Sequence, residues 1–143
     1  MAVTAEEKAA SAIRGKVGED AVCRYLEQQG YRIIKRNYRV KGGEIDIISL
    51  CGEGEKTTIC FTEVKTRKFG TNLTAWNPMT NAKKRRIIMT AERYMSEEKI
   101  RGKYWVSYDT AYVTVTTEEF PQVLDLKYYT ADFTADGLGL FII

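Results

Sequence analysis

Two neighbouring apolar segments that contain charged residues, 44–50 and 57–66, constrain the fold of this chain more than any other feature. Both segments are typical of β-strands, and the glycine-rich stretch between them predicts a hairpin loop. Asp46 interrupts the first segment, and Glu63 and Lys65 interrupt the second. Because burying an unpaired charge is costly, each of these side chains must be exposed, paired or bound to a ligand.

The alternation of side chains along a strand predicts where these charges point. Glu63 and Lys65 share one face, and alternation places Asp46 on the face opposite its neighbours Ile45 and Ile47. In a hairpin, both charged stretches lie far from the loop, although a slip of one residue would exchange the faces. The sequence therefore predicts that the three charged groups converge at one end of the hairpin.

The complete pattern predicts an α/β fold with a mixed central sheet flanked by helices, in the order α-β-β-β-α-β-(β). Helical periodicity weakens at Gly15 and Gly18, where the first helix is expected to break or restart. Residues 68–78 lack periodicity and predict a loop, and no linker divides the single domain expected over 1–143. The expected helices cover 5–29 and 80–96, and the expected strands cover 31–39, 44–50, 57–66, 104–115 and 123–129.

The absence of histidine excludes several classes of chemistry. Ser-His-Asp and Cys-His catalysis are not available, and the three cysteines cannot complete a structural zinc site. Acid–base chemistry must use Asp, Glu, Lys or Tyr, or water activated by a metal ion. Cys51 and Cys60 are placed to face each other across the hairpin, but free thiols are expected in a cytoplasmic protein.

No feature of the sequence predicts a membrane or secreted protein. No apolar stretch approaches the ~20 residues that a membrane-spanning helix needs. The N-terminal residues are polar and rich in alanine, without the apolar centre of a signal peptide. A cytoplasmic protein with no membrane partner is therefore expected.

Charge is unevenly distributed along the chain. Residues 65–103 contain eleven Lys and Arg but only three acids, whereas residues 104–143 contain six acids and one lysine. This asymmetry predicts either a surface that binds a polyanion or two solvated faces of opposite charge. Cations at the start of the second helix, Lys83 to Arg86, favour phosphate binding, because cations at a helix N-terminus are otherwise mildly unfavourable. Trp76, in the predicted loop, either fills a gap in the core or stacks on a base.

The converging carboxylates predict a metal site. Asp46 and Glu63 would repel each other unless a proton or a cation relieves them, and oxygen ligands suit Mg²⁺. Such a site, with Lys65 beside it, has the chemistry that phosphodiester hydrolysis requires. The alternative is a salt bridge with Lys65 on an exposed sheet face. Glu19 lies on the apolar stripe of the first helix, where it either points toward the sheet or complements the helix dipole.

Five short motifs together resemble the bacterial YraN family of predicted nucleases. They run in the family's order from about residue 12 to residue 113, and the residues from about 120 match poorly. The resemblance implies a restriction-endonuclease-like fold of the PD-(D/E)xK superfamily, related to archaeal Holliday-junction resolvases. The motifs are Gly15-Lys-Val-Gly-Glu19, Arg36-Asn-Tyr-Arg39, Gly43-Glu-Ile-Asp-Ile47, Phe61-Thr-Glu-Val-Lys-Thr-Arg67 and Lys83-Lys84.

The resemblance implies a role for each matching residue. Asp46 and Glu63 would bind Mg²⁺ or Mn²⁺ together with the Val64 carbonyl, and Glu19 would complete the site. Lys65 would position the attacking water, so the catalytic set comprises Asp46, Glu63, Lys65 and Glu19. Contacts to nucleic acid are expected from Arg36, Arg39, Arg67, Lys83, Lys84 and Arg86.

The expected function is therefore a metal-dependent nuclease that acts on DNA rather than RNA, including branched or structured DNA. A homodimer is the expected arrangement for a junction substrate, which ordinarily requires two active sites. The alternative is a catalytically silent nucleic-acid-binding module of the same fold. Two departures are visible: Ile45 replaces the motif's proline, and Ser107-Tyr108-Asp109 stands where a later strand often carries Arg-Phe-Asp.

Overall fold

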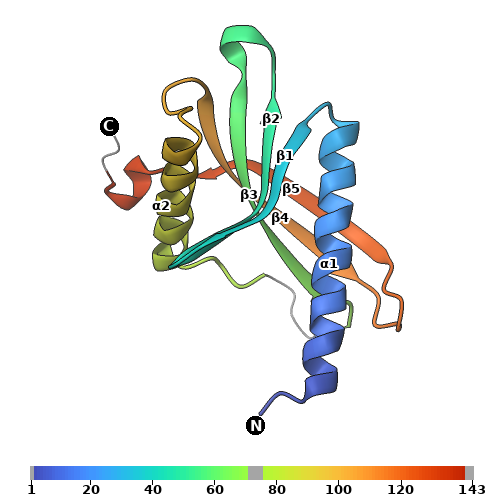
Figure 1. Ribbon diagram of the computed structural model, residues 1–143. Coiled ribbons are helices and arrows are strands. Elements are labelled where there is room, and N and C mark those ends of the chain that lie inside the picture. Colours follow the sequence, from blue (N-terminus) through green and yellow to red (C-terminus); the bar gives the residue numbers. More distant parts are fainter. Residues whose placement is uncertain (1, 71–75, 141–143) are drawn as a thin grey trace.

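A five-stranded mixed sheet lies between two helices in the computed structural model, which describes residues 2–70 and 76–140 (Figure 1). The strands follow the order β1-β2-β3-β4-β5, and only the β3–β4 pair is parallel. Helix α2 connects these two strands, as a parallel connection requires. The elements are α1 (Ala5–Gln28), β1 (Arg32–Val40), β2 (Gly43–Cys51), β3 (Thr58–Lys68), α2 (Asn81–Glu97), β4 (Trp105–Val115) and β5 (Val123–Phe133), with short 3₁₀ turns at Gly54–Lys56 and Asp136–Leu138.

The predicted order of helices and strands is confirmed, and most ends agree within two residues. The main difference is β5, which continues past residue 129 to Phe133, whose ring packs in the core. Of the loop predicted over 68–78, residues 71–75 lie outside the described residues, as do residues 141–143 of the poorly matching tail. No helix in the described ranges has the length and apolarity needed to span a bilayer.

Helix α1 is continuous, so the predicted break at its glycines is wrong. Thr4 caps the helix by accepting a hydrogen bond from the Glu7 N–H, and the Glu7 carboxylate accepts one from the Thr4 N–H. A Cβ at Gly18 would lie 2.0 Å from Thr66 Oγ1, whereas a Cβ at Gly15 would meet nothing within 4 Å. Gly18 is therefore needed for close packing of α1 on β3 rather than for a bend.

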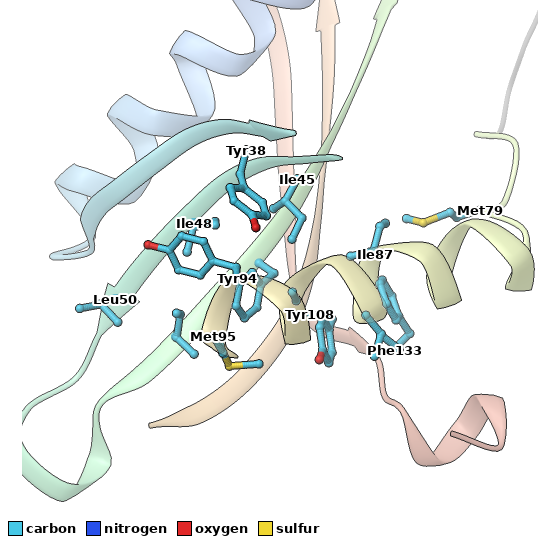
Figure 2. Packing of buried hydrophobic residues seen from close by; sticks show 14 residues of the cluster. Tyr38, Ile45, Ile48, Leu50, Met79, Ile87, Tyr94, Met95, Tyr108 and Phe133 are labelled. Atoms are coloured by element: carbon cyan, nitrogen blue, oxygen red, sulfur yellow. The ribbon is translucent and has the colours of Figure 1, made fainter. Parts of the chain in front are cut away.

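Helix α2 covers one face of the sheet with the larger hydrophobic cluster (Figure 2). Its N-terminus is capped by Thr80, whose hydroxyl accepts a hydrogen bond from the Lys83 N–H, as the sequence predicted. Ile88 and Ala91 are fully buried against strands β1 to β4 and the end of β5. The cluster comprises Tyr38, Ile45, Ile48, Leu50, Ile59, Phe61, Met79, Ile87, Ile88, Ala91, Tyr94, Met95, Tyr108 and Phe133.

Helix α1 packs on the opposite face, and here the predicted alternation of β2 is wrong. Ile47 packs against α1, while Ile45 joins the α2 cluster, although the two residues were expected to share a face. The two strands leave regular geometry together: Asn37, which lies across from Asp46, has a left-handed φ of 52°. The β2–β3 ladder also ends at the Ile47–Thr62 pair. The alternation of side chains is therefore interrupted at Asp46, and the β2–β3 pairing ends beside it.

A buried polar network ties β4 to β5. Asp109 is fully buried, and its carboxylate accepts hydrogen bonds from Ser107, the Tyr128 hydroxyl and the Ala131 N–H. Tyr128 also shares a hydrogen bond with Thr62 on β3. These hydrogen bonds satisfy the buried Asp109 carboxylate without a cation. The three cysteines are free, and the Sγ atoms of Cys51 and Cys60 lie 3.8 Å apart, facing each other as predicted.

Candidate functional site

Asp46 lies where β2 and β3 separate, and its carboxyl bridges the gap. Its Oδ2 accepts a hydrogen bond from the Val64 N–H of β3 at 2.7 Å, replacing the ladder bond that β2 no longer supplies. Burial and, second, the nearby Glu63 carboxylate together raise the pKa of Asp46 to about 7, against the opposing effect of the hydrogen bond from the Val64 N–H. The surroundings of Asp46 therefore disfavour the charged form of its carboxyl.

Glu63 is the second buried carboxyl of the site. Its side chain is only 13% exposed, and Oε1 lies 3.6 Å from the Lys83 Nζ on α2. Its Oε2 is buried and has no hydrogen-bond partner among the described residues. Burial raises the pKa of Glu63, against the opposing effect of Lys83 and Lys65 and of a hydrogen bond with Asp46. The structure therefore brings the two predicted carboxyls together, as the hairpin geometry suggested.

Lys65 follows on the same face of β3. Its Nζ donates to the main-chain carbonyl of Asn77 at 3.4 Å, so it lies at the edge of the segment that precedes α2. Val64 points its side chain to the α1 face. Since the N–H and C=O of a strand residue point to the same side, the Val64 carbonyl faces the edge that β2 has left. That carbonyl is available as a further oxygen ligand.

Glu19 reaches the same region from α1, but its carboxylate is already bound by an arginine and an amide group. Its Oε1 accepts hydrogen bonds from Arg36 Nε and Asn37 Nδ2, both at 2.9 Å. A cavity of about 670 Å³ between α1 and strands β1 to β3 is lined by both Glu19 and Asp46. Among the described residues, no three His, Cys, Asp or Glu side chains are gathered closely enough to hold a metal ion as they stand.

The six predicted nucleic-acid-binding cations do not form one surface. Arg36 forms ion pairs with Glu19 and Asp20, which raise the pKa of its guanidinium and lower that of Asp20. Arg39 pairs with Glu44 at 2.8 Å on an exposed strand edge. Both arginines nevertheless line the cavity that contains Asp46, where a phosphate would compete with their carboxylate partners.

The remaining four cations are Arg67 on β3, which also lines that cavity, and Lys83, Lys84 and Arg86 on α2. The Arg67 guanidinium stacks over the Trp76 ring at 4.0 Å, and Lys83 contacts the Glu63 carboxylate. Lys84 lies over the Phe133 ring at 5.6 Å. Arg86 lines a separate groove between α2 and the β1–β2 turn. Of these four, Lys83 and Arg67 adjoin the acidic pair or its neighbours on β3, whereas Lys84 and Arg86 contact other parts of the molecule.

The sequence analysis singled out Trp76 but missed the tyrosines that pack beside it and Lys65. Trp76 packs against Tyr112 with ring centroids 4.9 Å apart, and Tyr112 packs against Tyr129 at 5.6 Å. Tyr112 is the β-ladder partner of Lys65. The available signal was the alternation of β4 and β5, which places Tyr112 and Tyr129 on the face opposite Ala111 and Tyr128, but it could not reveal the neighbouring strand.

The donor set suits a hard divalent cation. The site offers only oxygen ligands. They come from the two carboxyls, whose pKa values are raised, and from the main-chain carbonyl of Val64. One of the Glu63 oxygens has no hydrogen-bond partner among the described residues. Mg²⁺ and Mn²⁺ prefer oxygen ligands, and a cation would stabilise the charged forms of both carboxyls, which burial disfavours. The ligands of the ion would be Asp46, Glu63 and the Val64 carbonyl. Glu19 lines the same cavity as Asp46 and would be a further ligand.

Comparison with known proteins gives a family-level match. The sequence model of the uncharacterised protein family UPF0102 matches residues 18–113, a range that includes Glu19, Asp46, Glu63, Lys65 and Lys83. A UPF0102 protein of Cytophaga hutchinsonii is 37% identical over 76% of this chain and 88% of its own length. A UPF0102 protein of Dechloromonas aromatica is 39% identical over 57% of this chain, and the match spans 65% of that relative. One from Chlorobium chlorochromatii is 44% identical over 57% of this chain and 60% of its own length.

Proposed function

This chain belongs to the UPF0102 family, and from its buried acidic pair we propose that it is a Mg²⁺- or Mn²⁺-dependent nuclease that hydrolyses phosphodiester bonds in DNA. The observation that carries the proposal is the pairing of Asp46 and Glu63 at the point where β2 and β3 separate. Two carboxyls buried against each other, one with an unpartnered oxygen, destabilise the fold unless a proton or cation relieves them. A role in binding a catalytic cation explains why the fold contains this destabilising pair of carboxyls.

Each side chain has a role in the proposed reaction. Asp46, Glu63 and the Val64 carbonyl would hold the cation, and the cation would supply Lewis-acid stabilisation of negative charge on the phosphate. Lys65, two residues from Glu63 on the same face of β3, orients the attacking water and stabilises developing negative charge. Lys83 holds the Glu63 carboxylate in place and lies within reach of a bound phosphate.

A restriction-endonuclease-like fold is part of this proposal. The observed mixed sheet carries a hairpin whose strands separate at the carboxylates, with one helix on each face. These features support the superfamily suggested by the motif order. Arg36 and Arg39, which line the cavity beside Asp46, are proposed to contact the DNA backbone there.

The test is cleavage of linear, flapped and four-way-branched DNA by purified protein with Mg²⁺ or Mn²⁺. Parent protein should cut at least one substrate in a metal-dependent manner, and Lys65→Ala should lower the rate by about 100-fold or more. Lys56→Ala removes an exposed lysine in the 3₁₀ turn between β2 and β3 and serves as the matched control. A parent protein that cuts none of the substrates, or a Lys65→Ala variant that cuts as fast as Lys56→Ala, would overturn the proposal.

A catalytically silent DNA-binding module is a second candidate, and a specific observation favours it. Glu19 is engaged by Arg36 and Asn37, and one oxygen of Glu63 lies near Lys83, so these two acids have cationic partners without a metal. Such a module would bind DNA in a salt-sensitive manner without turnover. Removing an acid from its surface would leave DNA binding unchanged or strengthen it. Measuring DNA affinity and cleavage side by side for Glu63→Ala separates the two candidates.

A further inference from the structure

An aromatic pocket opens on the α2 side of the sheet, beyond the region that α2 covers. It has a volume of about 280 Å³ and is lined by Trp76, Tyr112, Tyr129, Lys127 and Asp132. The three rings form a continuous series, because Tyr112 contacts both Trp76 and Tyr129. None of them belongs to the hydrophobic cluster under α2. The rings therefore pack on one another at the surface rather than in the core.

The pocket adjoins the candidate metal site through the strand register. Tyr112 on β4 pairs with Lys65 on β3 and with Lys127 on β5, so the three side chains lie in one row across the sheet. In the next row, Thr110 pairs with Glu63 and with Tyr129. A chain that occupied the pocket would consequently pass beside the acidic pair.

Exposure and charge identify what the pocket can take. Tyr129 is 47% exposed, and Lys127 and Asp132 are exposed as well. Open aromatic rings give sequence-tolerant stacking to any base, and adjacent cations track the phosphates of a single strand. Lys127 supplies such a cation, and Arg67, stacked on Trp76, supplies another. The Asp132 carboxylate repels phosphate but can accept a hydrogen bond from a base amino group.

We propose that this pocket receives an unpaired nucleobase, so that the substrate carries a single-stranded segment beside the scissile phosphate. The inference rests on the proposed function, since it specifies the class of DNA that the acidic site acts on. In a continuous duplex the bases are stacked and paired, and their faces are not accessible to Tyr129. A flap, a single-stranded end or an open junction presents the required face.

The experiment measures binding separately from cleavage. Fluorescence anisotropy in EDTA gives affinities for an oligothymidine of about 16 nucleotides and for a blunt duplex of the same length. Tyr129→Leu keeps apolar bulk but removes the ring, and it should weaken oligothymidine binding by about 5-fold or more while leaving duplex binding unchanged. Tyr129→Phe should bind both probes as the parent does.

Trp105→Leu is the matched control, because Trp105 is a 68% exposed aromatic residue at the opposite end of β4. It should leave both affinities unchanged, and thermal unfolding should verify that each variant is folded. The inference fails if Tyr129→Leu binds oligothymidine as tightly as the parent, if it weakens both probes equally, or if the parent does not bind oligothymidine. A pocket that instead serves a protein partner would give one of these results.

Failure of this inference can be distinguished from failure of the proposed nuclease. If Lys65→Ala abolishes cleavage while Tyr129→Leu leaves oligothymidine binding intact, the acidic site is catalytic and the pocket assignment is wrong. If no substrate is cut but Tyr129→Leu still weakens oligothymidine binding selectively, the pocket stands as part of a single-strand-binding module. Both results are read from the same protein preparations.

Discussion

Replacing Asp46 with asparagine should stabilise the metal-free protein in alkaline solution. The Asp46 carboxyl is buried next to Glu63, and both causes raise its pKa from 3.8 to about 7. Asparagine keeps an oxygen that can accept the Val64 N–H, but it carries no charge at any pH. The substitution therefore removes the repulsion and leaves the strand contact in place.

The magnitude follows from the pKa difference. Between pH 3.8 and about 7 the folded protein binds more protons than the unfolded chain, so stability is lost as pH rises through this window. Full ionisation of Asp46 costs about 4 kcal/mol, and about 2.5 kcal/mol of this is lost between about pH 5 and about pH 8.5. Glu63, whose pKa is also raised, contributes in the same direction.

Urea unfolding in EDTA at about pH 5 and about pH 8.5 measures this effect. Parent protein should lose about 2.5 kcal/mol or more across the interval, whereas Asp46→Asn should lose clearly less and exceed the parent at the higher pH. Asp20→Asn is the control of opposite sign, because Arg36 lowers the pKa of Asp20 and its charge stabilises the fold. A parent stability that is constant with pH, or an Asp46→Asn variant that declines as steeply, would refute the reasoning.

Two further predictions concern the packing of α1 on β3 and the buried hydrogen bonds of Asp109. Gly18→Ala should lower the free energy of unfolding by about 1–3 kcal/mol, because its Cβ would meet Thr66, whereas Gly15→Ala should raise it by about 0.5–1 kcal/mol. Thermal or urea unfolding of the two alanine variants tests this, and equal effects would contradict it. Asp109→Ala should cost about 3 kcal/mol or more, since it leaves the Tyr128 hydroxyl and other buried donors without their acceptor. Tyr128→Phe removes only one donor and should cost about 1 kcal/mol in the same urea measurement.

The local pattern of the sequence was sufficient to predict most elements. The cap at Thr80, the helical stripe of α2 and the alternation of β4 are short-range features, so their physical causes lie within a few residues. The separation of Ile45 and Ile47 onto opposite faces was not predictable in this way. It depends on the left-handed Asn37 of a different strand and on the end of the β2–β3 ladder.

The candidate site was predictable in part. The hairpin brought Asp46 and Glu63 together because antiparallel pairing of adjacent segments follows from the sequence. The partners that determine their charge state come from elsewhere: Lys83 from α2 and, on the far side of the cavity, Glu19 held by Arg36. A charge-pattern argument placed these cations on a surface but could not show which carboxylates they contact.

The sequence by itself determined that this chain forms an α/β sheet with a charged hairpin, without histidine chemistry. It did so because strand alternation, helix caps and composition are properties of residues close together in the chain. Only the tertiary structure decided that a buried oxygen of Glu63 lacks a hydrogen-bond partner in the described part of the chain, and that Tyr112 lies beside Lys65. Strands β3 and β4 are parallel neighbours joined through α2, so residues that touch across this pair lie far apart in the sequence. No short-range pattern in the sequence predicts which of these residues become neighbours.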